Sequence, residues 1–240
     1  MASLDNDTIR AFDSDVDAHD GYVYTTMDRL SSRLACERFV RTVVSLTDMR
    51  GRTLLDVGCG DGYFTRLYYD AQHPASVVAI DPAERAISAA AAKRGSREID
   101  FRVGNGHSIP FDDKSFDIVL VQAVIHHDDD PADLVREACR LGREVVILEP
   151  NGYNVVLKII EKVSPYHRRH KEKSYAPRSI DRWIARAGGR VVARKYSGLV
   201  PMFAPDFLAR ACKALEPAVE ATPILNRVSC GQYTVKALVG

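Results

Sequence analysis

Between residues 53 and 150, short apolar runs alternate with segments whose apolar residues recur at helical spacing. The apolar runs have the length of β-strands: TLLDV (53–57), SVVAID (76–81), IDFRVG (99–104), SFDIVLVQAV (115–124) and EVVILEP (144–150). The segments between them predict helices: DGYFTRLYYDA (61–71), PAERAISAAAAKRG (82–95) and DPADLVREACRLG (130–142). We expect Asp130 to cap the last of these helices and Gly142 to end it. Nearly continuous apolar strands that alternate with helices predict a parallel sheet covered on both faces.

The two flanking regions lack this regular alternation. Residues 1–50 predict a helical lid, with its clearest helix in MDRLSSRLACERFVRTVVSL (27–46) after an acidic start. After residue 150 the pattern predicts a helix, then PRSIDRWIARAGG (177–189) as a second helix and RVVARKYS (190–197) as a strand. Helical residues 200–229 and a last strand, GQYTVKALVG (231–240), complete the chain. We therefore expect one domain over 1–240, with a lid at 1–50, a core at 51–150 and cap insertions plus the last strands at 151–240.

The composition disfavours nucleic-acid-binding, membrane-binding and disulfide-rich proteins. The 240 residues include 33 Lys plus Arg and 32 Asp plus Glu, so the net charge of +1 provides no global field for nucleic acid or anionic lipid. The five cysteines form no C-x-x-C pair, which argues against a disulfide framework and a structural metal site and favours a reducing, cytoplasmic setting. We expect no secretory signal, no membrane span and no metal ligands.

The first strand runs into a glycine loop of the form D-x-G-x-G-x-G, made by Asp56, Gly58, Gly60 and Gly62. Such loops bring backbone close to a nucleotide. The dinucleotide fingerprint has its third glycine where this chain has Tyr63, and an acidic residue before the loop suits a cationic or zwitterionic ligand better than a pyrophosphate. An NAD-dependent oxidoreductase stays open as an alternative, although this spacing disfavours it.

The stretch LLDVGCGDGYF resembles motif I of class I S-adenosylmethionine (SAM) dependent methyltransferases. The resemblance continues through VVAID, SIPF, SFDIV and the HH followed by DP, and covers about residues 50–150. It is closest to the ubiquinone/menaquinone-biosynthesis-like branch. It implies a Rossmann-like α/β fold with a mostly parallel seven-stranded sheet, an antiparallel last strand and helical N-terminal and C-terminal cap insertions.

The same resemblance implies which residues hold SAM. They are Asp56, Gly58, Cys59, Gly60, Gly62, Asp81, Pro82, Asn105, Gly106, His107 and Gln122. Asp81 stands where family members bind the ribose hydroxyls, and its alternative role is to cap the helix that follows. Asp56 either contacts the ligand or braces the loop. Asn105 departs from the family's usual aspartate, which predicts a weaker hydrogen bond to the adenine amino group.

Methyl transfer requires alignment of acceptor, methyl and sulfur, and a base only where the acceptor loses a proton. His126 and His127 follow the fourth strand on the ligand side, and family analogy places them near the sulfonium. Either histidine has a pKa range suited to a general base. The alternative is that one packs structurally and the other pairs with the acids of DDDP.

The acceptor pocket is expected from the lid and the cap. Tyr22, Tyr24, Asn151 and Tyr153 are the candidate residues that bind the substrate, with ordinary packing as the alternative for the tyrosines. The basic cluster YHRRHKEK (166–173) either binds an anionic group of the acceptor or forms a solvated helix end.

The sequence thus predicts a SAM-dependent methyltransferase for a small-molecule acceptor, a metabolite, lipid or glycan, with a preference for methylation of oxygen. The alternative is a SAM-binding protein of this fold that transfers no methyl group.

Overall fold

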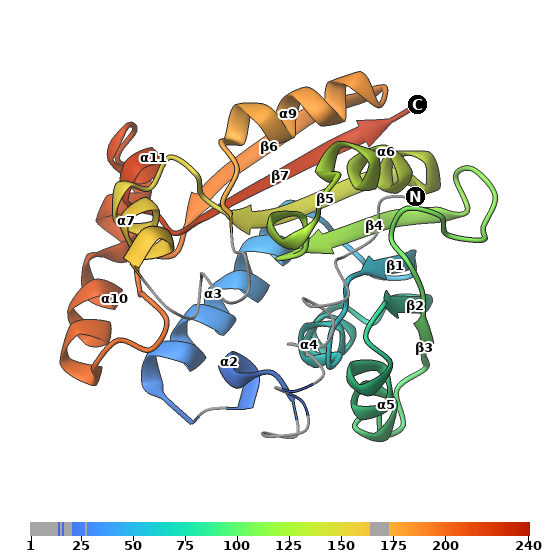
Figure 1. Ribbon diagram of the computed structural model, residues 1–240, viewed down its shortest axis with the longest axis horizontal. Coiled ribbons are helices and arrows are strands. Elements are labelled where there is room, and N and C mark those ends of the chain that lie inside the picture. The colour runs from blue at the N-terminus through green and yellow to red at the C-terminus, as the bar shows by residue number, and fades with distance from the viewer. Residues whose placement is uncertain (1–13, 15, 17–20, 27, 164–172) are drawn as a thin grey trace.

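A computed structural model describes residues 14, 16, 21–26, 28–163 and 173–240. Its centre is a seven-stranded sheet in the order β3-β2-β1-β4-β5-β7-β6 (Figure 1). The strands are β1 (Thr53–Val57), β2 (Ser76–Asp81), β3 (Ile99–Val103), β4 (Phe116–Gln122), β5 (Gly142–Pro150), β6 (Gly189–Ser197) and β7 (Gln232–Val239). The first five strands pair in parallel, whereas β7 runs antiparallel to both β5 and β6. The predicted fold class is therefore confirmed.

Each helix predicted from apolar spacing is present. The helices are α2 (Val23–Thr26), α3 (Leu30–Leu46), α4 (Tyr63–Gln72), α5 (Glu84–Ala92), α6 (Pro131–Leu141), α7 (Val155–Val163), α9 (Pro177–Arg186), α10 (Asp206–Ala221) and α11 (Leu225–Ser229), with a 3-10 turn η1 (Ile125–His127). The Asp130 side chain caps α6 by accepting from the backbone N–H of Asp133 at 3.2 Å. Gly142 ends α6 and begins β5 at once.

Helices cover both faces of the sheet because alternate strand residues point to opposite sides. Leu54 and Leu55 are both fully buried and belong to two separate apolar clusters. One cluster packs strand residues against α6 and α9 and includes Leu134, Val135, Ile180 and Ile184. The other packs them against α3 and α4 and includes Ala35, Phe39, Val43 and Tyr68. Figure 1 shows these two helix pairs on opposite sides of the strands.

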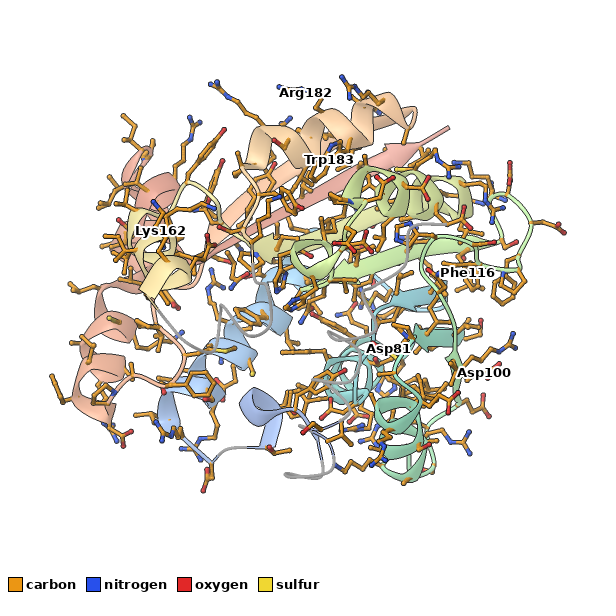
Figure 2. All side chains as sticks on the ribbon, in the orientation of Figure 1. Asp81, Asp100, Phe116, Lys162, Arg182 and Trp183 are labelled. Atoms are coloured by element: carbon orange, nitrogen blue, oxygen red, sulfur yellow. The ribbon has the colours of Figure 1, made fainter. Side chains whose placement is uncertain are left out.

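The parallel strands β1, β2, β4 and β5 all end at the same edge of the sheet. The glycine loop follows β1, Asp81 ends β2, Gln122 ends β4 and Pro150 ends β5. Figure 2 labels Asp81 at this edge and Lys162 on α7, which belongs to the cap. In open α/β sheets, ligands bind outside the carboxyl ends of the strands. The fold therefore collects most of the predicted site residues at one place.

The C-terminal helices form a cap beside this edge. Helices α7, α10 and α11 stand together at one end of the molecule (Figure 1), and α10 also packs on α3. An ion pair between Arg38 of α3 and Glu220 of α10 joins the two helices, and Glu220 also accepts from the backbone N–H of Gly198 at 2.9 Å. Within the described residues, no helix is long and apolar enough to cross a membrane.

Candidate active site

The loop after β1 adopts a conformation that requires glycine. Gly58, Gly60 and Gly62 have φ angles of 75°, 55° and 69°, in the left-handed region where a side chain is strained. The backbone N–H groups of Gly58 and Cys59 both donate to the carbonyl of Ile80, at 2.8 and 3.0 Å. These bonds tie the loop to the end of β2, so the two segments that the sequence predicts to bind the nucleotide form one unit.

Asp81 holds the glycine loop and faces the cavity beside it. Its Oδ2 accepts from the backbone N–H of Gly60 at 2.8 Å, and its Oδ1 accepts from that of Ala83 at 2.9 Å. The helix begins only at Glu84, with Ala83 at the N-cap position, so Asp81 does not cap it. The buried carboxylate has two oxygens with several lone pairs, which leaves acceptor capacity for ligand hydroxyls.

Asp56 is a buried carboxyl under the loop. Its Oδ2 accepts from the Thr65 hydroxyl at 2.6 Å, a contact that braces the loop against α4. Burial raises the pKa of Asp56 to about 6; the Thr65 bond opposes this, and the charge of Asp81 adds to it. Asp56 also lines the cavity, so both roles expected from the sequence are compatible with its position.

Gln122 places a buried side-chain amide at the end of β4. Its Oε1 accepts from the hydroxyl of Tyr68, which is fully buried in α4. Within the described part of the chain, its buried Nε2 has no hydrogen-bond partner. A buried amide without a partner is costly unless a ligand or water completes it. Because Gln122 lines the cavity, a polar ligand group is the natural partner.

A cavity of about 620 Å³ extends from the glycine loop to the cap. Its volume lies in the range typical of small-molecule sites. The predicted cofactor residues that line it are Asp56, Gly58, Cys59, Gly60, Asp81, Pro82 and Gln122. The predicted residues His126, His127 and Tyr22 line it too. Apolar side chains surround the part below the cap: Phe39, Val156, Leu157, Ile160, Leu199, Val200, Met202, Phe203 and Val228.

The two histidines stand in η1, immediately after β4. His126 is buried, and its Nδ1 lies 2.7 Å from Oε2 of Glu149 at the end of β5. The other oxygen of Glu149 accepts from the backbone N–H groups of Val124 and Ile125, both at 2.8 Å. The ring of His127 lies 3.9 Å from that of His126, centroid to centroid. Both rings line the cavity, but only His126 bonds to Glu149.

The residues expected at the adenine, Asn105 to His107, are not among the residues that line the cavity. Asn105 is exposed, and its Oδ1 accepts from the backbone N–H of His107 at 2.9 Å. The His107 ring bridges Asp128 at 2.8 Å and Asp133 at 3.0 Å. Burial alone would lower the pKa of His107, but these bonds outweigh it and raise the pKa. Gly106 packs close to Val57.

Only some of the described residues that were predicted to bind the methyl acceptor line the cavity. Tyr22 lines the cavity, whereas Asn151 and Tyr153 do not. The Asn151 amide donates to the carbonyls of Arg227 and Cys230, at 2.8 and 2.9 Å, so it anchors the end of β5 to the cap. The side chain of Tyr24 and residues 166–172 of the basic cluster lie outside the described residues.

Sequence reasoning missed Glu149, Tyr68 and the loop 198–203. Glu149 did carry a signal, because an acid next to the end of the apolar run EVVILEP is unusual for a strand buried on both faces. Tyr68 carried no signal of a role in the site, because a tyrosine on the apolar face of a helix ordinarily packs in the core. The residues of the loop 198–203 reach the cavity only through the packing of the cap.

Part of the chain is similar to known methyltransferases. Residues 55–155 match the profile of a family described as a methyltransferase domain. A ubiquinone biosynthesis O-methyltransferase of Bradyrhizobium sp. (strain ORS 278) is 36% identical over 128 residues, which are 51% of this chain and 46% of that protein. The chain thus spans about half the length of the curated relatives it first matches.

Solved structures share the fold. A SAM-dependent methyltransferase from Thermotoga maritima aligns with a TM-score of 0.70 at 15% identity, over 97% of this chain and 100% of that one. Magnesium protoporphyrin IX methyltransferase from Synechocystis PCC 6803, solved with bound S-adenosylhomocysteine (SAH), aligns with a TM-score of 0.61 at 13% identity, over 88% of this chain and 84% of that one. The chain thus has the fold of these methyltransferases, and residues 55–155 match the methyltransferase domain profile.

Proposed function

We propose that this protein transfers a methyl group from SAM to a small, largely apolar acceptor, with oxygen as the preferred nucleophile. The observation that carries the proposal is the continuous cavity in which the glycine loop, two histidines and apolar cap residues meet. The names of the relatives, which are O-methyltransferases of ubiquinone biosynthesis, support the preference for oxygen.

The residues at the carboxyl edge of the sheet fit SAM. Asp81 would accept from the ribose hydroxyls. The Nε2 of Gln122, which has no partner among the residues that the structure describes, would donate to a polar group of the methionine portion. Asp56 and Asp61 place further negative charge along the same wall, which suits a sulfonium better than a pyrophosphate. SAM, when bound, supplies an activated methyl group on a positively charged sulfur.

The chain's own residues then orient the acceptor, exclude water and take up its proton. The apolar lining below the cap favours an acceptor with an apolar body over a glycan. Val156 and Val228 line the cavity and are 63% and 41% exposed, so the cap side of the cavity has an apolar border that suits the entry of such a molecule. His126 or His127 would accept the proton of a hydroxyl acceptor.

The experiment is an incubation of the purified protein with SAM and a panel of apolar compounds that carry a free hydroxyl. Each compound is paired with its O-methylated counterpart, which has no hydroxyl to modify. We expect SAH to form with at least one hydroxyl compound and not with its counterpart. Saturable SAM binding without SAH formation across the panel would favour the SAM-binding protein that transfers no methyl group.

A further inference from the structure

Glu149 is a buried carboxylate whose hydrogen bonds, among the described residues, all run to the turn that carries the two histidines. Its side chain is 1% exposed. Three donors converge on it, the backbone N–H groups of Val124 and Ile125 and the Nδ1 of His126. Within the described part of the chain, no Lys or Arg forms an ion pair with it. Three donors suit an ionised carboxylate, which only accepts hydrogen bonds.

These bonds fix the turn as well as the ring. The strand β4 ends at Gln122, and Ala123 turns the chain with a φ of 57°, while its N–H donates to the carbonyl of Leu148 at 2.8 Å. The 3-10 turn closes with a bond from the His127 N–H to the Val124 carbonyl at 3.0 Å. The backbone of β5 and the Glu149 side chain therefore both hold η1 against β5.

The bond to Glu149 also determines which nitrogen of His126 carries the proton. A carboxylate requires a donor, so Nδ1 is protonated and the lone pair of the neutral ring lies on Nε2. His127 has no such bond to Glu149, although its ring lies 3.9 Å away from that of His126. The two histidines are thus not equivalent toward Glu149, which sets the tautomer of His126.

We propose that Glu149 is the positioning residue of the proton transfer and that His126, through Nε2, is the group that takes the proton. This inference rests on the proposed function. As the acceptor oxygen bonds to the methyl carbon and the methyl–sulfur bond breaks, the hydroxyl proton moves to Nε2 of His126. The positive charge lost by sulfur is then balanced by an imidazolium next to the Glu149 carboxylate, until the proton passes to solvent.

Glu149→Gln is the decisive variant because it keeps the shape of the side chain. The amide oxygen of the substituted side chain would stay with the two backbone N–H donors, so its NH₂ group would face Nδ1 of His126. The ring must then accept at Nδ1 and carry its proton on Nε2. The variant is therefore expected to switch the tautomer. Glu137→Gln is the matched control, since Glu137 is a buried acid bonded to the Ile109 N–H and Arg140, away from the cavity.

The first readout is the ¹⁵N NMR spectrum of the His126 side chain at a pH where the ring is neutral. We expect the Nδ1–H form in the wild type and in Glu137→Gln, and the Nε2–H form in Glu149→Gln. An Nε2–H form in the wild type would overturn the proposal even if Glu149→Gln failed to fold. This readout requires neither SAM nor an acceptor, so it does not depend on the proposed function.

The second readout is methyl transfer with the acceptor found in the panel. Glu149→Gln is expected to lower kcat by about 10²- to 10⁴-fold, the usual contribution of a general base, with the Kd for SAM changed less than about twofold. In a His126→Ala background the same substitution should have no further effect. An unchanged kcat in Glu149→Gln would overturn the proposal, whereas a wild type without any transfer would instead contradict the proposed function.

Discussion

The ring of Tyr22 lies directly over Gly60 of the glycine loop, so close that a Cβ at Gly60 would come within 2.3 Å of the ring. The lid and the loop are joined a second time, because the backbone N–H of Tyr22 donates to Asp61 at 3.3 Å. The sequence predicts that Tyr22 binds the methyl acceptor. In the structure Tyr22 also packs on the loop that would hold the cofactor.

Gly60→Ala should therefore weaken both the fold and the binding of SAM. The left-handed φ of 55° costs a side chain about 1–2 kcal/mol, and the contact with Tyr22 adds to this cost. Gly51→Ala is the matched control, because Gly51 has a φ of 67° but nothing within 4 Å of its Cβ position. Urea unfolding should show a greater loss of unfolding free energy for Gly60→Ala than for Gly51→Ala. Equal losses would mean that Tyr22 moves aside freely.

The buried Asp56 predicts a pH dependence of stability. Its pKa rises from 3.8 to about 6 on folding, so the native state holds the proton more tightly than the unfolded state. The free energy of unfolding should thus fall by about 3 kcal/mol, from this group alone, as the pH rises from below 4 to above 6. Asp56→Asn removes the titration and keeps an acceptor for Thr65. If the free energies of unfolding of the wild type and Asp56→Asn differ by the same amount at pH 4 and at pH 7, the Asp56 carboxyl is not desolvated in the native state.

The attachment of the cap depends on Arg38. This side chain is 13% exposed and pairs with Glu220, with Glu216 at 3.6 Å. Arg38→Leu would leave two nearly buried acids without this partner, at a cost of about 3 kcal/mol. Hydrogen exchange of α10 should become faster. Arg41→Leu on the same helix is the control, since its pair with Glu37 is exposed and contributes about 0.5 kcal/mol at most. Similar effects of both variants would contradict an anchoring role for Arg38.

Asn105 stands where members of the methyltransferase family usually have an aspartate, so its substitution tests whether this position contacts the adenine. If its side chain faces the adenine amino group, Asn105→Asp should tighten SAM binding by a few fold, about 1 kcal/mol, because a charged acceptor makes the stronger bond. Its Oδ1 accepts from the His107 N–H, and an aspartate would keep this contact. Calorimetric titration with SAM measures the change. No gain in affinity would place Asn105 outside the cofactor site.

Much of the fold was predictable because local signals and global packing agree. Continuous apolar runs such as TLLDV form central strands since both faces of the sheet are covered. Asp81 was placed correctly at the end of its strand for the same reason, because parallel strands end at one edge.

The contacts between distant elements were not predictable. His126 and Glu149 are 23 residues apart on different elements and meet only because β4 and β5 are neighbours in the sheet. Asn151 suggested a ligand contact, yet its amide bonds to carbonyls 76 and 79 residues further along the chain. Polar side chains of this kind show their role only once the partner segment is in place.

Calorimetric titration of the purified protein with SAM is the direct test of whether the glycine loop and Asp81 bind SAM. We expect saturable binding at one site, weakened about 10-fold or more by Asp81→Ala, which removes the charged acceptor at the end of β2. NAD⁺ titrated in the same way should give no binding. Binding of NAD⁺ in place of SAM would contradict a SAM site at the glycine loop. SAM binding that Asp81→Ala leaves unchanged would contradict the role of Asp81 in that site.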